Sequence, residues 1–165
     1  MSPRPHPLWP AVEACLPALW RAVRAYEADR ALQEDLLQEV LLAAWQALPS
    51  VRDPAAVRAF ALRIAHNLGA SHVRSAVRRP PGEDLDALAA LPAPEEDPRS
   101  RWLLDAMRAL PLSLRQPLML QLEGFDYREI AAMTGLSPEN VGVRLHRARA
   151  RLTALSQEDA PDAAR

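Results

Sequence analysis

The sequence predicts an all-α protein built from two small helical domains, and three observations support this prediction. Ala and Leu dominate the 165 residues and only 5 are Gly, which favours helices over tight hairpin turns. No segment alternates apolar and polar residues as a half-buried strand does. The 16 prolines interrupt the chain, and 49% hydrophobic with 25% charged residues is the composition of a globular protein.

Charge divides the chain, although its formal net charge is only −1. Residues 1–79 hold ten arginines and seven acids, whereas residues 80–100 hold one arginine, six acids and several prolines. Residues 101–152 are again basic, with eight arginines and five acids. We therefore expect domains at 1–79 and 101–155, an acidic, Pro-rich linker at 80–100 and a tail at 156–165.

The first domain is predicted to hold three helices. An apolar stripe at helical spacing runs from Leu8 to Tyr26 and marks the first helix. The second covers about 33–48 and the third about 54–79, where Asp53 suits an N-cap and Pro54 the first helical position. The lone Cys15 forms neither an internal disulfide nor a zinc cluster, so we expect a small buried apolar side chain.

The second domain is predicted to hold four helices. A residue that favours N-caps precedes or opens each of them, namely Ser100, Ser113, Asp126 and Ser137. Gln116 and Glu129 stand three residues after two of these caps, as in a capping box. Pro117 is tolerated only near the start of its helix, and Pro138 suits the first position of the last one.

The last two helices form a predicted helix-turn-helix motif. Gly135 stands where the preceding helix must end in a left-handed conformation. The residues where two crossing helices would touch are small or apolar, namely Ile130, Ala131, Leu136 and Val141. In such a motif the second helix enters the major groove of DNA.

On a helical wheel, the last helix turns Val141, Leu145, Ala148 and Leu152 inward. The residues that face outward are Glu139, Val143, His146 and Ala150. Four arginines border this outward face, where they could grip phosphates on the walls of a groove, namely Arg144, Arg147, Arg149 and Arg151. The alternative is a solvated charged face that complements the helix dipole.

Longer runs resemble a known family. The runs EDLLQEVLLAAWQAL (34–48) and RAFALRIAHNLGASHVR (58–74) resemble region two of bacterial extracytoplasmic-function sigma factors. Residues 110–152, which include DYREIAAMTGLSPENVGVRLHRARARL, resemble region four of the same family. The resemblance implies a transcription initiation factor whose partners are core RNA polymerase and promoter DNA, with an anti-sigma factor as a further partner of the family.

The resemblance also implies roles for individual residues. The second helix would dock on core polymerase through Asp35, Leu36, Gln38, Glu39, Leu42 and Trp45. The third helix would read the proximal promoter element through Arg63, Asn67, Arg74 and Arg78, which share one flank. The last helix would read the distal element through Ser137, Glu139, Asn140, Val143, Arg144, Arg147 and Arg149. The loop 49–53 would capture an unstacked base of the non-template strand.

The residues themselves leave one alternative open for the second helix. Leu36, Leu37, Val40, Leu41 and Leu42 form more apolar surface than one stripe needs, so part of it could meet a partner, or all of it could be core. Four departures from the family pattern bear on promoter sequence, namely Val51 for an aromatic residue, Phe60 for Trp, Ser71 for Asp, and Gly142-Val143 for a Lys-Ser pair.

Other classes of protein fit the sequence less well. There is no Gly-rich phosphate loop and no nucleophile motif, and His66 and His72 do not share a helix face, so we expect no enzyme, cofactor, metal site or small-molecule substrate. No apolar run reaches the length of a membrane span, so we expect a cytoplasmic protein. The main rival is a stand-alone helix-turn-helix regulator that binds duplex DNA, and a third reading is a sigma-like interaction module without promoter function.

Overall fold

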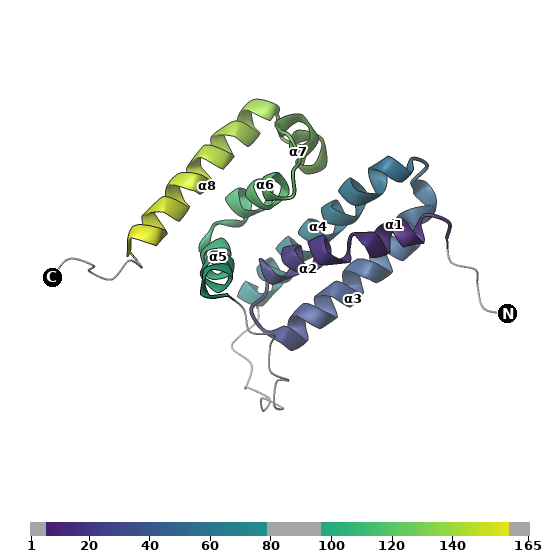
Figure 1. Ribbon diagram of the computed structural model, residues 1–165, viewed down its shortest axis with the longest axis horizontal. Helices are drawn as coiled ribbons and strands as arrows, with labels where there is room; N and C mark the ends of the chain where they lie inside the picture. The colour runs from purple at the N-terminus through teal and green to yellow at the C-terminus, as the bar shows by residue number, and fades with distance from the viewer. Residues whose placement is uncertain (1–5, 79–96, 159–165) are drawn as a thin grey trace. The chain divides into compact units, whose positions relative to one another are not determined.

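The structure is a computed structural model that describes residues 6–78 and 97–158. Every regular element in these two ranges is a helix, which confirms the all-α prediction. The chain forms two compact units, unit one (Met1–Glu96) and unit two (Asp97–Arg165), drawn in Figure 1. Most of the expected linker and the end of the expected tail lie outside the described residues. No described helix combines the length and the apolar character that crossing a membrane requires.

Unit one holds more helical elements than expected. They are α1 (Trp9–Ala14), α2 (Leu16–Arg24), α3 (Arg30–Ala47), the 3-10 turns η1 (Leu48–Ser50) and η2 (Pro54–Ala56), and α4 (Val57–Arg78). The single first helix predicted from the apolar stripe is wrong, since the chain breaks at Cys15 between α1 and α2. Pro17 explains the break, because it has no N–H to donate to the carbonyl of Glu13 and its ring would clash there.

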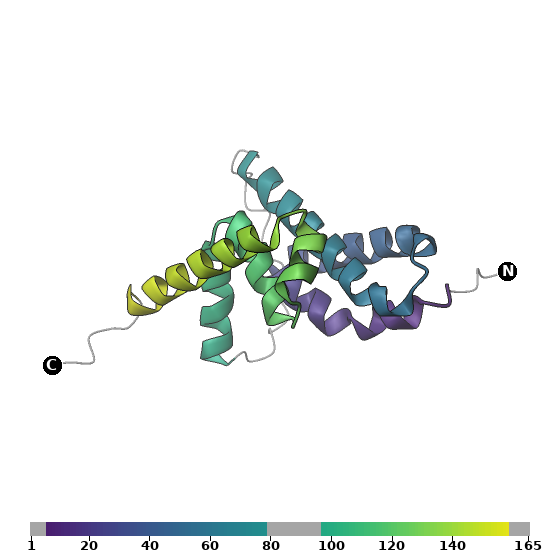
Figure 2. The ribbon, with the colours of Figure 1, turned by 90° about the horizontal axis from the view of Figure 1, so that it is seen from above.

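The core of unit one lies where α4 packs against α1, α2 and α3 (Figure 2). Its most deeply buried large side chains include Val12, Leu19, Val23, Val40, Leu48 and Leu62. Two polar contacts link α4 to residues that follow α2. Nδ1 of the buried His66 lies 2.8 Å from the hydroxyl of Tyr26, and Nε2 of His72 lies 2.6 Å from Oε2 of Glu27. Both histidines of α4 therefore connect it to the chain around the end of α2.

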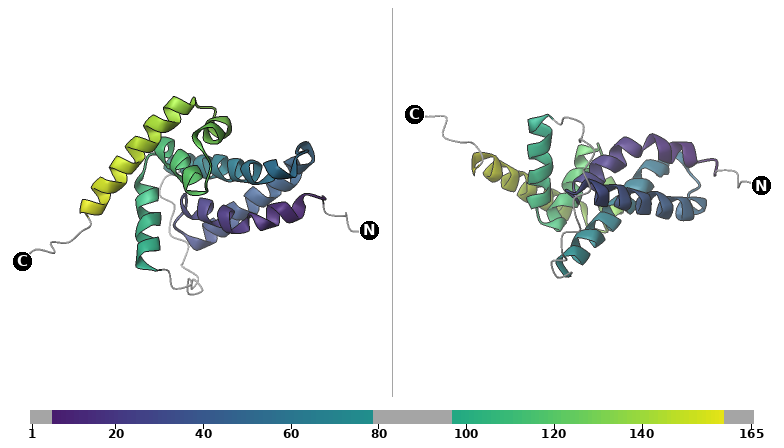
Figure 3. Two further views of the ribbon diagram at one scale, coloured as in Figure 1. Left: turned by 45° about the horizontal axis from the view of Figure 1, so that its top comes forward. Right: turned by 90° about the horizontal axis from the view of Figure 1, so that it is seen from below.

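The described part of unit two, residues 97–158, holds four α-helices, as predicted. They are α5 (Pro98–Ala109), α6 (Leu112–Leu122), α7 (Tyr127–Thr134) and α8 (Pro138–Glu158), and α6 and α7 pack against α8 (Figure 3). Two predicted caps are wrong. Ser100 lies inside α5, which begins at Pro98, and Ser113 lies inside α6, which follows Pro111. Proline at the first helical position loses no hydrogen bond, which lets α5 begin before the serine.

Candidate nucleic-acid interface and partner-binding helix

The turn between α7 and α8 has the geometry that the sequence predicts for a helix-turn-helix motif. The Asp126 side chain accepts from the amide of Glu129 at 2.9 Å, and the Glu129 carboxylate accepts from the amide of Asp126 at 2.7 Å, which confirms the capping box. Gly135 ends α7 at φ 74°, in the left-handed region where glycine carries no Cβ penalty. The Ser137 hydroxyl accepts from the amide of Asn140 at 3.2 Å and starts α8.

Helix α8 turns one face into unit two and the opposite face to solvent. Val141, Leu145 and Ala148 are each 0% exposed, as predicted, and Leu152, also predicted to face inward, is half-buried. The residues predicted to face outward are all exposed, namely Glu139, Val143, His146 and Ala150. Asn140 and Arg147, on one shoulder of that face, are exposed as well. The helix therefore presents a polar and cationic strip to solvent while its apolar stripe holds it on α6 and α7.

Two of the four arginines on α8 are engaged within unit two. Nη1 of Arg144 donates to the carbonyl of Ser113 at 3.2 Å. This carbonyl lacks its usual partner inside α6, because residue 117 is a proline and has no N–H. Nη2 of Arg149 donates to Oε1 of Gln121 at 2.5 Å. Each contact uses one of five guanidinium donors, so both arginines tie α8 to α6 and keep donors for a ligand.

Arg147 and Arg151 differ from this pair. Both side chains are exposed, and neither forms a hydrogen bond or ion pair with any residue in the ranges 6–78 and 97–158. An exposed guanidinium with all donors directed to water suits a phosphate oxygen, since an Arg–phosphate pair can be bidentate. These two side chains are therefore the freest cations of α8 within the part of unit two that the structure describes.

Helix α4 carries a second polar flank. Arg63, Asn67 and Arg74 are exposed, and their spacing places them on one side of the helix. Arg78 is the last residue of α4, and its side chain lies outside the description. The same helix buries Val57, Ala61 and Ala65 on its inner face. Residues of the predicted proximal-element site thus share a solvent-facing flank as far as the structure describes them.

The loop before α4 is locally ordered by its own hydrogen bonds. The amide of Val51 donates to the carbonyl of Leu48 at 2.9 Å, and the Ser50 hydroxyl donates to the carbonyl of Ala47 at 2.7 Å. The Asp53 side chain accepts from the amide of Ala55 at 2.9 Å, as its predicted capping role requires. Val51 is half-buried, and base capture by this loop stays a prediction.

Helix α3 presents charged, polar and apolar side chains that do not pack in the core of unit one. Asp35, Gln38 and Glu39 are exposed, and so are Leu42 at 58% and Trp45 at 37%. All five lie on one face of the helix. Leu36 differs from this group, because it is only 2% exposed and packs in the core of unit one. Leu36 therefore supports the helix from inside and lies outside the exposed face.

Trp9 adds to this face and was not predicted from the sequence. Its ring lies 5.0 Å from the ring of Trp45, edge to face at 78°, and its Nε1 donates to Oε1 of Glu13 at 3.0 Å. Such an aromatic pair contributes about 0.5–1.5 kcal/mol beyond its buried area. Helix α1 thereby fixes the position of an exposed tryptophan on α3. The sequence signal was weak, since Trp9 simply precedes a proline at the start of an apolar stripe.

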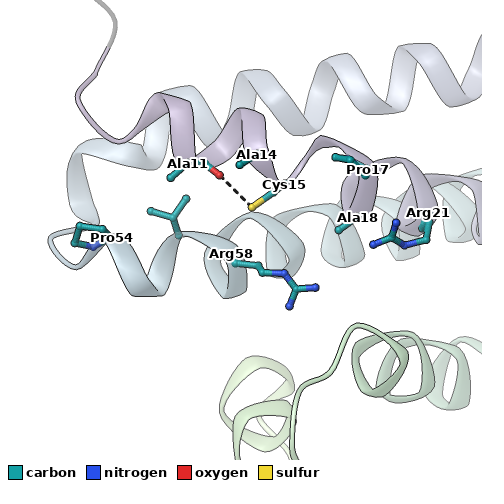
Figure 4. Close-up of a pocket in the computed structure, with 9 residues that line it drawn as sticks. Ala11, Ala14, Cys15, Pro17, Ala18, Arg21, Pro54 and Arg58 are labelled. Carbon is teal, nitrogen blue, oxygen red and sulfur yellow. Dashed lines mark hydrogen bonds between the residues drawn. The ribbon is translucent and has the colours of Figure 1, made fainter.

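A hollow of about 340 Å³ lies between α1, α2 and the start of α4 (Figure 4). Cys15 borders it and donates its thiol to the carbonyl of Ala11 at 3.2 Å. Burial raises the pKa of the Cys15 thiol, and the charge of Arg58 opposes this effect. The thiol therefore stays protonated and serves packing, as the sequence predicted for this residue. Among the residues that the structure describes, no group of three or more His, Cys, Asp or Glu side chains could hold a metal ion.

Comparison with protein families gives two matches that together span most of the chain. Residues 11–79 match the family model Sigma-70 region 2, and residues 100–152 match Sigma-70, region 4. The first match covers the helices α2 to α4, and the second covers α5 to most of α8.

Two relatives of similar sequence are named as RNA polymerase sigma factors. The chain is 36% identical over 150 residues to the probable RNA polymerase sigma factor RfaY of Xanthomonas campestris pv. campestris, a match that covers 84% of this chain and 38% of that protein. It is 31% identical over 131 residues to the ECF RNA polymerase sigma-E factor of Escherichia coli strain K12, which covers 70% of this chain and 69% of the other. The chain thus spans well under half of the first relative and about two thirds of the second.

Two solved structures are also similar. The sigma factor RpoE, in complex with the anti-sigma factor NepR from Bartonella quintana, aligns with a TM-score of 0.68 and 26% identity over 89% of this chain and 96% of that one. CnrH, in complex with the cytosolic domain of CnrY, aligns with a TM-score of 0.67 and 28% identity over 93% and 89%. From its two family matches and its relatives, this chain belongs to the extracytoplasmic-function (ECF) family of RNA polymerase sigma factors.

Proposed function

We propose that the chain binds core RNA polymerase through the exposed face of α3 and directs it to promoters through α4 and α8. The observation that supports this most directly is the exposed face of α3, defined by Asp35, Gln38, Glu39, Leu42 and Trp45. Helix α3 buries Leu36 and Val40 in the core, whereas Leu42 and Trp45 on the same helix are exposed to solvent. Apolar side chains rimmed by carboxylates suit a protein partner with apolar and basic groups.

The recognition of DNA divides between the units. In unit two, Glu139, Asn140 and Val143 lie near the start of α8, where recognition helices contact base edges. Arg147 and Arg151 would neutralise phosphates beside them. In unit one, the flank with Arg63, Asn67, Arg74 and Arg78 would follow the proximal element. These assignments make initiation at specific promoters the task of the chain, carried out in the cytoplasm where polymerase acts.

The alternative of a stand-alone regulator is not favoured. A regulator of that kind needs only the helix-turn-helix unit and a surface for self-association. The match to Sigma-70 region 2 instead accounts for residues 11–79, which hold the exposed face of α3. Both similar solved structures contain a second protein, and one of these is named as an anti-sigma factor. We include an anti-sigma factor among the proposed partners of this chain.

Co-elution with bacterial core RNA polymerase tests the proposal. The purified chain should elute with core in gel filtration, and the variant Asp35→Arg plus Glu39→Arg should not, because it reverses the charge at the rim of the docking face. The matched control is Asp105→Arg plus Glu158→Arg, which makes the same charge change on exposed positions of unit two and should still co-elute.

The outcomes separate the two parts of the proposal. If the unchanged chain fails to co-elute while it still binds duplex DNA, the stand-alone regulator is the better explanation. If the Asp35 and Glu39 variant co-elutes normally, the docking surface lies elsewhere on the chain. Circular dichroism of each double variant should match that of the parent, because the four substituted positions are exposed and lie outside the core.

A further inference from the structure

We propose that Val143 recognises the methyl group of a thymine in the major groove of the distal promoter element. This inference rests on the proposed function of α8 and names the base that one of its residues reads. The thymine C5-methyl is the apolar group among the base edges of the major groove, and apolar side chains contact it. Three features of α8 point to this assignment.

The first feature is the exposure of Val143. Its side chain is 47% exposed, on the face of α8 opposite the fully buried Val141 and Leu145. The core of unit two therefore does not require an apolar residue at this position. A polar side chain would satisfy the fold equally well, so packing within the described part of unit two does not determine the valine.

The second feature is the local weakness of the helix. Gly142 and Val143 are consecutive residues of low helix propensity in the first half of α8. A Cβ at Gly142 would lie 3.4 Å from Cε2 of Tyr127, an ordinary van der Waals distance, so packing does not require the glycine. The exposed Val143 is not required by packing either. Contact with an apolar group of a ligand would offset the unfavourable choice of a β-branched residue.

The third feature is the position of Val143 among its neighbours. It stands five residues after Pro138, the first residue of α8, and thus within the part of a recognition helix that contacts base edges. Ala150 lies on the same outward face together with Glu139 and His146, whereas Asn140, Arg147 and Arg151 lie along one side of it. A short apolar side chain beside a row of cations fits a groove whose wall carries phosphates.

Replacement of thymine by uracil in the DNA tests this inference, because it removes only the methyl group. The full chain, and the holoenzyme that it forms with core polymerase, would each select binding sites from a pool of randomised duplexes. Each thymine of the selected distal element is then replaced by deoxyuridine, and the affinity is measured by fluorescence anisotropy. One replacement should weaken binding about fourfold, which is what burial of one methyl group is worth.

The variant Val143→Ala should bind thymine and uracil duplexes equally at that position. Alanine is the best helix former, so loss of discrimination cannot come from loss of α8. The matched control is Val77→Ala, which shortens an 82% exposed valine on α4 and should keep the full discrimination.

Three results would overturn the inference. Val143 does not read a methyl group if no uracil replacement weakens binding, or if Val143→Ala keeps the same ratio as the parent. The inference is also refuted if the selected distal element contains no thymine on either strand. Failure of the holoenzyme to form, with normal thymine discrimination by the chain alone, would instead refute the proposed polymerase function and leave this inference standing.

Discussion

Substitution of Gly69 by alanine should destabilise unit one, although helix propensity alone predicts the opposite. Gly69 lies in the interior of α4, and a Cβ there would lie 2.6 Å from Cγ and 3.0 Å from Cε2 of Tyr26. The Tyr26 side chain is 4% exposed, and its hydroxyl is held 2.8 Å from Nδ1 of the fully buried His66. The ring therefore cannot yield to the new methyl group without disturbing this hydrogen bond.

The size of this destabilisation follows from two unfavourable terms and one favourable term. Overpacking of a filled core costs about 1–3 kcal/mol. Disturbance of a buried hydrogen bond adds about 1 kcal/mol. Replacement of glycine by alanine inside a helix returns about 1 kcal/mol. We expect Gly69→Ala to lower the free energy of unfolding of unit one by about 1–3 kcal/mol, whereas propensity alone would raise it by about 1 kcal/mol.

Urea unfolding followed by tryptophan fluorescence measures this difference. Both proteins should carry Trp102→Phe, because the remaining tryptophans, Trp9, Trp20 and Trp45, all lie in unit one. Addition of Tyr26→Ala to both chains removes the ring, so Gly69→Ala should then raise the free energy of unfolding by about 1 kcal/mol. Equal or greater stability of Gly69→Ala in the presence of Tyr26 would refute the argument from close packing.

Two further predictions concern single side chains. Arg147→Ala should lower the slope of log affinity for duplex DNA against log salt by about 0.9 and leave the urea unfolding of unit two unchanged. Arg144→Ala should destabilise unit two, because it removes the hydrogen bond to the carbonyl of Ser113. Unfolding curves of the same shape and midpoint for both variants would contradict this difference. Burial raises the pKa of the Cys15 thiol, so iodoacetamide should alkylate it slowly in the folded chain at a mildly alkaline pH and rapidly in urea. Equal rates in the two conditions would show that the thiol is accessible.

Local signals account for the helices that were predicted correctly. Asp126, Gly135 and Ser137 act within one turn of chain, so their effect on α7 and α8 can be read without knowledge of the fold. The break at Cys15 was missed because apolar periodicity does not register the N–H that Pro17 lacks. Ser100 was a plausible cap by residue type, but α5 begins earlier, at Pro98.

The predictions for side chains succeeded where periodicity separates two faces. On α8 the buried and exposed residues alternate clearly, so Val141 and Val143 were assigned to opposite sides correctly. On α3 apolar residues occur all round the helix, and only the packing of α4 decides that Leu36 is core and Leu42 is surface. The edge-to-face pair of Trp9 and Trp45 joins positions far apart in sequence, so no local pattern could reveal it.

The arginine cluster of α8 shows why charge alone did not settle the roles of its members. Pro117 removes one N–H from α6, and the carbonyl of Ser113 that this leaves open is the acceptor for Arg144 on α8. Arg149 reaches α6 in a similar way through Gln121. Cationic side chains thus hold α8 in place, while Arg147 and Arg151 keep their donors exposed. Under the proposed function, a helix already fixed by its own arginines loses little conformational entropy when it enters the groove of DNA.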